Sequence, residues 1–433
     1  MKYILKNVNL LDGTKNNVLQ ENMDVFVENG IIKKVGKDIF KEGAELIDLT
    51  GKYLMPGLIN LHVHLPGSGY PSKKQKDNRP LVNFVKSNFI GHKVGEILTK
   101  TYAEVNLLSG TTTLRSVGGV SYFDSLVRDN INKGKYLGPR IVSCNEAVTV
   151  AGGHMEGTVS YGAKDIPDME RHIEEQVKTG ADWIKIMITG GVLDAKKKGE
   201  PGEMKMTPEQ VKACCDKAHA LGKKVCAHVE SPEGVKVAVE NGVDSIEHGA
   251  EVTPEIVKTL KDNNGVVVCT LSPAIPCCYF DCGFPDPDMA KANGIALKSG
   301  IIQCAKECLK NGIKLGMGTD SGCPYTTHYD LWRELEYFHH YLGVTREESL
   351  HLATLNNAEI LGLQGETGSI EEGKSADFIV SSKNPLDGFD ALRKLDMVGF
   401  KGNIIKNPSP KKSEEAEKEL DNFYYNQLEN DPA

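Results

Sequence analysis

The sequence predicts an α/β fold: a (β/α)8 barrel of the TIM type with a small β-sandwich module built from both chain termini. Strand-like and helix-like segments alternate between residues 58 and 361, which is the pattern of a parallel β/α domain. Eight of these segments resemble strands, the number that closes a barrel. Strand-like runs also occur near both ends, in groups too small for a stable sheet alone, so we expect the two groups to meet.

The N-terminal part of the β-module contains short strand-like runs around Tyr3, Val25 and Ile32. Asn29-Gly30 separates two of these runs and is a strong hairpin signal. Similar runs return near the other end of the chain. The predicted organisation is a composite β-sandwich module (1–57 plus 362–405), a barrel (58–361) and a charged C-terminal tail (406–433) that is a solvent-exposed helix or partly disordered.

The predicted barrel strands are short apolar runs bounded by turn residues, and helix-like patterns fill the intervals between them. One helix start is well defined, because Thr207-Pro208-Glu209-Gln210 combines an N-cap threonine with proline and glutamine at favoured positions. A further helix, 345–361, leads back to the β-module. The strands are predicted at 57–64, 111–117, 139–150, 183–188, 224–228, 243–248, 266–270 and 313–318.

The composition is that of an ordinary globular protein, with 40% hydrophobic and 25% charged residues. The formal net charge is −8 and no basic face is evident, which argues against nucleic acid or an anionic membrane as a partner. No N-terminal apolar run or membrane-length segment is present. Eleven cysteines without a secretion signal indicate reduced thiols and a cytoplasmic location. We expect a small-molecule substrate, and the oligomeric state stays open, with a homo-oligomer among the options.

The first predicted barrel strand ends in His62-Val63-His64. Residues two apart on a strand project from the same face, so the two imidazoles would point together and form half of a metal site. The alternative is that two histidines simply cap a buried strand.

Other predicted strands also end in residues that can bind metals, on the face where this fold carries its chemistry. A single residue of this kind has an ordinary explanation, such as a hydrogen-bonded core histidine, a snorkelling lysine or a helix N-cap. The occurrence of several such residues together at the C-terminal ends of the predicted strands favours a metal site. The residues are His62, His64, Lys185, His228, His248 and Asp320.

Lys185 is flanked by Ile184, Ile186 and Met187, and burial among these residues would favour its neutral amine. A neutral lysine reacts with carbon dioxide to form an anionic, bidentate carbamate, which would bridge two divalent ions. His62, His64 and Asp320 would complete the shell of one ion, and His228 and His248 that of the other. A water shared by two such ions loses a proton near neutral pH, and Asp320 would take that proton and pass it to the leaving amine.

These motifs resemble those of the metal-dependent amidohydrolase superfamily, in particular its prolidase-like and imidazolonepropionase-related branch of Xaa-Pro dipeptidase-like enzymes. The resemblance implies a binuclear centre, usually of zinc, bridged by carboxylated Lys185, and a β-module built from both termini. The donor set itself does not select zinc over manganese, iron or cobalt. The matching stretches are 55–64, 110–115, 185–192, 243–249, 318–322 and 368–377.

Three further residues are predicted to contact the substrate. The resemblance places His154 near the substrate carbonyl oxygen, where it would stabilise an oxyanion; the alternative is a loop histidine bound to the backbone. Glu230 stands where dipeptidase-like members carry tyrosine, so it would favour a neutral or cationic substrate group unless it pairs with a nearby lysine. His328 is predicted to reach the pocket from the loop after the last strand.

Cys277, Cys278 and Cys282 lie in the loop that follows the seventh predicted strand. A zinc site would need a fourth ligand at suitable spacing, and none is present there, so thiols that line the pocket are favoured over a metal or redox site.

The predicted function is a binuclear metal-dependent hydrolase that cleaves an amide bond of a dipeptide or N-acyl amino acid by a metal-bridging hydroxide. The alternative is a mononuclear imidazolonepropionase-like cyclic amide hydrolase or a deaminase. Deaminase relatives carry glutamate three residues after the fifth-strand histidine, whereas this chain has Ser231. A third hypothesis, a catalytically inactive scaffold, is disfavoured because all six ligand positions are retained.

Overall fold

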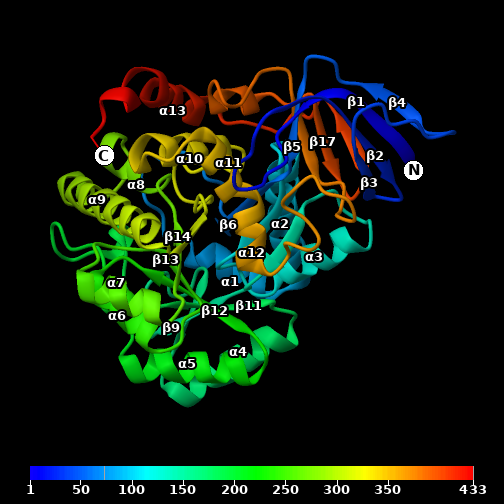
Figure 1. Cartoon of the computed structure of the whole chain (residues 1–433). Helices are drawn as coiled ribbons and strands as arrows, with labels where there is room; N and C mark the ends of the chain where they lie inside the picture. Colours follow the sequence, from blue (N-terminus) through cyan, green and yellow to red (C-terminus); the bar gives the residue numbers. More distant parts are fainter. Residues whose placement is uncertain (73, 433) are drawn as a thin grey trace.

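The computed structural model describes residues 1–72 and 74–432 (Figure 1). Its centre consists of parallel strands that form two sheets and follow one another in chain order except for β10, which lies at the outer side of β9. The smaller sheet has the order β6-β7-β8 and the larger β10-β9-β11-β12-β13-β14-β15. Their bounds are Leu58–Val63 (β6), Thr111–Ser116 (β7), Arg140–Ser143 (β8), Ala147–Val150 (β9), Ser160–Ala163 (β10), Trp183–Met187 (β11), Lys224–Val229 (β12), Ser245–His248 (β13), Val266–Cys269 (β14) and Lys314–Met317 (β15).

The strand predicted at 139–150 is two strands, β8 and β9, and this is where the two sheets part. Asn145 lies between them with a φ of 57°, in the left-handed region that interrupts an extended strand. Its side-chain oxygen accepts a hydrogen bond from the Ser125 hydroxyl at 2.6 Å, which holds the bend. The parallel strands are therefore ordered as in a TIM barrel. However, their hydrogen bonds define two sheets, whereas the sequence predicted one closed sheet.

The outer edges of the two sheets meet at β6 and β15. The backbone amide of Asp320 donates to the carbonyl of His62 at 2.8 Å, and that of His64 donates to Ser321 at 2.7 Å. Asn357 strengthens this junction, because its side-chain amide donates to the carbonyls of Ile59 and Met317, each at 2.8 Å. The junction brings the end of β6 next to the residues that follow β15.

Helices fill the intervals between the strands, as the alternating pattern predicts. The N-cap of α5 is Thr207, with the predicted proline and the reciprocal glutamine contact. The helices are α1 (Arg79–Ser87), α2 (Phe89–Leu108), α3 (Phe123–Asn132), α4 (Ile166–Lys178), α5 (Pro208–Ala220), α6 (Pro232–Glu240), α7 (Pro254–Asp262), α8 (Ala274–Tyr279), α9 (Pro287–Asn311) and α10 (Leu331–Tyr337). Among the helices of the described residues, none is long and apolar enough to cross a membrane.

The predicted helix at 345–361 is a run of three segments: α11 (Arg346–His351), a π-helical stretch (Leu352–Asn356) and α12 (Asn357–Leu361). The wider π-helical turn precedes Asn357, whose side chain fixes the β6–β15 junction. The change of helix type therefore occurs directly before the residue that joins the edge strands β6 and β15.

Strands from both ends of the chain pair in one eight-stranded sheet beside the parallel strands (Figure 1). Its central junction is antiparallel pairing of β5 with β16, in which Met55 lies opposite Ile379. One apolar core includes Tyr3, Val25 and Phe378 from the two ends. The two-layer sandwich form and the exact module boundaries stay predictions. The strands are β1 (Lys2–Leu10), β2 (Gln20–Glu28), β3 (Ile31–Gly36), β4 (Glu45–Asp48), β5 (Tyr53–Pro56), β16 (Phe378–Ser381), β17 (Met397–Phe400) and β18 (Asn403–Lys406).

The C-terminal tail forms a helix, which was one of its two expected forms, but this helix is not wholly exposed to solvent. The helix, α13 (Glu414–Asn426), buries Ala416, Leu420 and Phe423. Arg333 on α10, itself buried, donates to Asp421 on α13 at 2.5 Å. The many charges of the tail hide this apolar stripe, whose spacing of four and three residues is that of one helix face.

Candidate metal centre and substrate pocket

His62, His64 and Asp320 meet at the β6–β15 junction. Asp320 Oδ1 lies 3.4 Å from His62 Nε2 and 3.1 Å from His64 Nε2. Asp320 has a φ of 58°, and this left-handed turn directly after β15 directs its carboxylate back toward β6. Gly318 allows the close approach of the two strands, because a Cβ there would lie 2.5 Å from the Cβ of His62.

His228 and His248 lie at the ends of the adjacent strands β12 and β13. Their ring centroids are 4.7 Å apart, and the same distance separates His248 from His62. His248 links the two halves of the site, because its ligand atoms group with those of His62 and Asp320 and also with those of His228 and Glu230. The His248 ring is held by Thr270, whose hydroxyl lies 2.7 Å from Nδ1.

Lys185 is the central residue of β11 and lines the same cavity as these histidines. Only 1% of its surface is exposed. Five of the six predicted ligand residues line this cavity, and the sixth, His62, contacts one of them, Asp320. All six are buried or nearly so, and the structure brings together the residues that the sequence placed at strand ends.

Burial sets the protonation of the histidines. It lowers the pKa of His62 and of His228 well below the usual value, with a further contribution from neighbouring positive groups. Burial also lowers the pKa of His248 to about 3. Neutral imidazoles carry the lone pair that a metal ion requires. Burial alone would raise the pKa of Asp320, but the contact with His64 lowers it, so this carboxyl is ionised.

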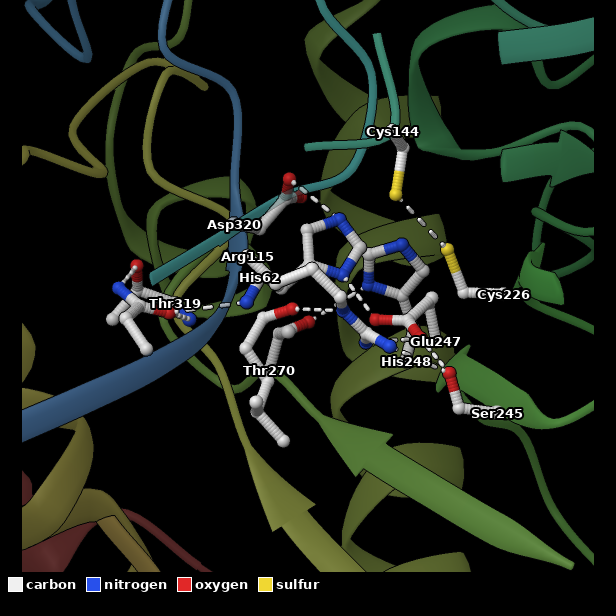
Figure 2. A network of polar contacts seen from close by, with 12 residues as sticks. His62, Arg115, Cys144, Cys226, Ser245, Glu247, His248, Thr270, Thr319 and Asp320 are labelled. Atoms are coloured by element: carbon white, nitrogen blue, oxygen red, sulfur yellow. Dashed lines mark hydrogen bonds and ion pairs between the residues drawn. The ribbon is translucent and has the colours of Figure 1, made fainter. Parts of the chain in front are cut away.

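A network behind the histidines, which sequence reasoning missed, fixes their orientation (Figure 2). Glu247 Oε2 lies 2.8 Å from His62 Nδ1, and Arg115 donates to the other carboxylate oxygen at 2.6 Å. Ser245 donates to that same oxygen at 2.7 Å. The sequence signal was a charged residue within each of two buried strands, next to a histidine in the case of Glu247. Carboxylates that hold a ligand histidine by its second nitrogen are typical of metal sites.

The residues fit a divalent metal centre. Among the residues that the structure describes, His62 Nε2 and Asp320 Oδ1 are buried polar atoms without a hydrogen-bond partner. Such atoms are costly unless something binds them, and imidazole nitrogens together with carboxylate oxygens are ligands that zinc and similar ions accept.

The cavity above these residues has a volume of about 510 Å³, the size of a small-molecule site. His154 lies at its wall with its ring stacked on that of His228, the centroids 4.2 Å apart. Its Nδ1 lies 2.9 Å from Asp194, a second residue that sequence reasoning missed. Because Nδ1 is occupied, Nε2 is the nitrogen left for a ligand.

Glu230 also lines the cavity and is buried. Burial, reinforced by the nearby carboxylates of Asp320 and Asp194, raises its pKa well above the usual value. Its only basic neighbour within ion-pair distance in the described part of the chain is His228, with Nε2 3.7 Å from Oε1. No lysine partner of the kind considered from the sequence is found there.

His328 does not line the cavity in the described structure, although a substrate contact was predicted for it. Its Nε2 lies 2.7 Å from the carbonyl of Gly67, and its Nδ1 lies 3.0 Å from the Asn106 side chain. The ring stacks on Tyr102 at 4.8 Å. Both nitrogens are used within the protein, so His328 supports the loop after β6.

Two of the three loop cysteines, Cys277 and Cys282, line the cavity together with Cys323, as expected for pocket thiols. Cys278 is buried beside them. Cys323 lies nearest to the ligands, with its sulfur 3.5 Å from Asp320 Oδ2.

Comparison with known proteins agrees with this geometry. The model of the amidohydrolase family matches residues 53–406. The chain is similar to a structure described as a candidate prolidase from Bifidobacterium longum, with 32% identity, a TM-score of 0.84 and coverage of 98% and 99% of the two chains. It is also similar to a Xaa-Pro dipeptidase with bound methionine in the active site, with 28% identity, a TM-score of 0.81 and coverage of 94% and 100%. Ochratoxinase of Aspergillus niger is 26% identical over 386 residues, which cover 82% of this chain and 76% of that protein.

Proposed function

The chain belongs to the amidohydrolase family, and from this premise we propose that it is a binuclear metal-dependent hydrolase that cleaves an amide bond of a small molecule. The protein is a hydrolase acting on carbon–nitrogen bonds, in line with its prolidase-like and ochratoxinase relatives. The proposed substrates are dipeptides or N-acyl amino acids. The observation that supports the proposal best is that two buried atoms of the predicted ligands, His62 Nε2 and Asp320 Oδ1, have no hydrogen-bond partner among the described residues.

In this proposal His62, His64 and Asp320 would hold one divalent ion, and His228 and His248 would hold the other. Lys185, as a carbamate, would supply oxygen ligands to both, and zinc is the preferred metal. When bound, the two ions would supply Lewis acidity for the scissile carbonyl and would lower the pKa of the attacking water. Glu247 and Thr270 support the site by fixing the rings of His62 and His248.

The chain's own residues move the proton and stabilise charge. Asp320 accepts the proton of the attacking water as the water oxygen bonds to the carbonyl carbon. The same proton then goes to the nitrogen of the leaving amine as the carbon–nitrogen bond breaks, so that an acid and an amine are released. His154, held by Asp194 through Nδ1, directs Nε2 toward the developing oxyanion.

Three further parts of the proposal concern the whole molecule. We infer that the two parallel sheets act as one (β/α)8 barrel, supported by the backbone contacts between His62 and Asp320. Glu230 is proposed to contact the substrate. A reducing, cytoplasmic location is proposed on the cysteine content alone.

The test is elemental analysis of metal per chain, for wild type and Lys185→Ala, both purified in bicarbonate-containing buffer. Lys224→Ala is the matched control, because Lys224 begins the neighbouring strand β12 and is exposed. We expect about two ions per chain in wild type and control and a clear loss in Lys185→Ala. Equal content of one ion in all three proteins would remove the carbamate bridge and favour the mononuclear cyclic amide hydrolase or deaminase. Protein without metal would contradict the whole proposal.

A further inference from the structure

We infer that the substrate is a hydrophobic amide without a carboxylate, with a large apolar group against α1 and α2 and a neutral or cationic hydrogen-bond donor facing Glu230. This inference rests on the proposed function, because it names the substrate class for the same cavity. It narrows that proposal, since ordinary dipeptides and N-acyl amino acids carry a free carboxylate.

One wall of the cavity is apolar and comes from helices α1 and α2, which lie between β6 and β7, and from the turn after β7 and the start of α3. Its residues are Leu81, Val82, Val85, Leu98, Val120 and Phe123. Leu81 lies at the rim, with 51% of its surface exposed. An apolar substrate group that packs against this wall contributes a favourable binding free energy in proportion to the apolar area that it buries.

The opposite sheet contributes Glu230, directly after β12. The residue is only 9% exposed, and its Oε2 has no hydrogen-bond partner among the described residues. Gly191 permits the tight fit around this carboxyl, because a Cβ there would lie 3.1 Å from Glu230 Oε1 and 3.0 Å from His154. An acceptor left unpartnered in a pocket wall is matched by a substrate group that donates, such as an amide N–H or an ammonium.

The cavity offers few basic groups that could pair with a substrate carboxylate. Among the lining residues that the structure describes, the lysines are Lys185, which belongs to the metal centre, and Lys76, which is exposed at the rim. The remaining basic side chains are histidines that the proposed function assigns to the metal centre or to the oxyanion: His64, His154, His228 and His248. No arginine is among the described lining residues. A buried carboxylate needs an ion pair or several donors, and near Glu230 it would instead meet a second carboxyl group.

The test uses amides of three matched leaving amines: alanine, alaninamide and 1,2-diaminopropane, the last acylated at its 2-amino group. The carbon that bears the acylated nitrogen carries a methyl group in all three, and it also carries a carboxylate, a carboxamide or an aminomethyl group. Each amine is acylated with decanoate or with acetate, and kcat/KM is measured on the metal-loaded enzyme. We expect the neutral and cationic amines to exceed alanine by about tenfold or more. Decanoyl compounds should exceed acetyl compounds by about a hundredfold.

Two pairs of variants localise the effect. Glu230→Gln should reduce the preference for the cationic over the neutral amine by about tenfold, while the control Glu240→Gln, an exposed residue at the end of α6, leaves it unchanged. Leu98→Ser should reduce the decanoyl over acetyl preference by about tenfold. The neighbouring control Ile97→Ser should stay within about twofold, because Ile97 is 58% exposed and faces away from the cavity lining.

The outcomes separate this inference from the proposed function. Metal-loaded enzyme that prefers the alanine compounds, or that hydrolyses none of the six, overturns the inference and leaves the metal centre standing. Loss of a metal equivalent in Glu230→Gln also overturns it, because Glu230 would then be a ligand of the ion at His228 and His248. If wild type holds no metal, the proposed function fails, and calorimetric binding of the same six compounds still decides the preference.

Discussion

Glu247 accepts a hydrogen bond from His62 through Oε2 at 2.8 Å, while its other oxygen is paired with Arg115 at 2.6 Å. All three side chains are fully buried. One carboxylate therefore both orients a predicted metal ligand and neutralises a guanidinium in the core. Metal binding and folding stability should depend on the same residue.

Glu247→Gln is expected to weaken both properties. Glutamine places an N–H group where Glu247 has an acceptor oxygen for His62 or for Arg115 and Ser245, and Arg115 loses its buried counter-ion. We expect a loss of about 3–5 kcal/mol in the free energy of unfolding and a decrease of about 10- to 100-fold in metal affinity. Urea unfolding and metal titration measure these quantities. Glu251→Gln, an exposed carboxyl beyond β13, is the control, and equal behaviour of the two variants would remove Glu247 from the metal site.

His328 should make stability depend on pH. Burial lowers its pKa from 6.5 to about 4, so between these values the unfolded chain binds a proton that the folded chain does not. Stability is then complete above pH 6.5 and falls as the pH drops toward 4. For this residue the difference amounts to about 3 kcal/mol.

His328→Gln keeps a donor and an acceptor at the same position but does not titrate. We expect its unfolding free energy, measured by urea at pH values from 7 to 4.5, to decline less steeply than that of wild type. His92→Gln, on the more accessible surface of α2, should follow the wild-type slope. A variant as steep as wild type would show that His328 does not carry this dependence.

Asp431→Ala should destabilise the wall of the cavity through α8 and α9, which Asp431 contacts. Asp431 pairs with Lys298 on α9 at 2.6 Å, and both are buried. The same carboxylate accepts hydrogen bonds from Tyr279, at the end of α8, and from Tyr341. Removal of one partner leaves a buried ammonium unpaired, which costs about 3–5 kcal/mol.

Urea unfolding of Asp431→Ala measures this loss, and KM should rise because α8 carries Cys277 in the cavity lining. The double variant Asp431→Ala with Lys298→Met removes both charges and should recover most of the stability. Failure of the double variant to recover would mean that the tyrosine contacts, and not the ion pair, hold this segment.

Gly318→Ala tests the close approach of β6 and β15. The added Cβ would lie 2.5 Å from the Cβ of His62 and 2.8 Å from its backbone nitrogen. Separation of the strands should cost about 1–3 kcal/mol of unfolding free energy, and displacement of His62 should lower the metal content. Gly36→Ala, where nothing lies within 4 Å of the new Cβ, is the control. Full metal content in Gly318→Ala would contradict this role.

The sequence predicted the parallel strands closely because each is a short buried apolar run; the segments at 111–117 and 224–228, for example, differ from β7 and β12 by one residue each. The break between β8 and β9 was not predictable, because the left-handed backbone of Asn145 is stabilised by Ser125, which lies 20 residues away. The packing of α13 was missed for another reason: its buried stripe lies among charges, and only its spacing indicates a buried face.

The ligand residues were predictable because strand ends gather on one face of such a fold. Glu247 and Asp194 were not assigned, because their roles depend on contacts with His62 and His154 that lie 185 and 40 residues away in the chain. The interpretation of His328 as a substrate contact followed from its place in a loop. Its actual surroundings depend on α2, which supplies Asn106 and Tyr102.

The pairing of β5 with β16 also has a consequence for synthesis on the ribosome. Met55 leaves the exit tunnel about 320 residues before its partner Ile379. At a typical elongation rate the edge of β5 waits on the order of 20–60 s for that partner. An unpaired strand edge invites association with other nascent chains. We therefore expect the yield of folded protein to depend on chaperones that shield the N-terminal strands during translation.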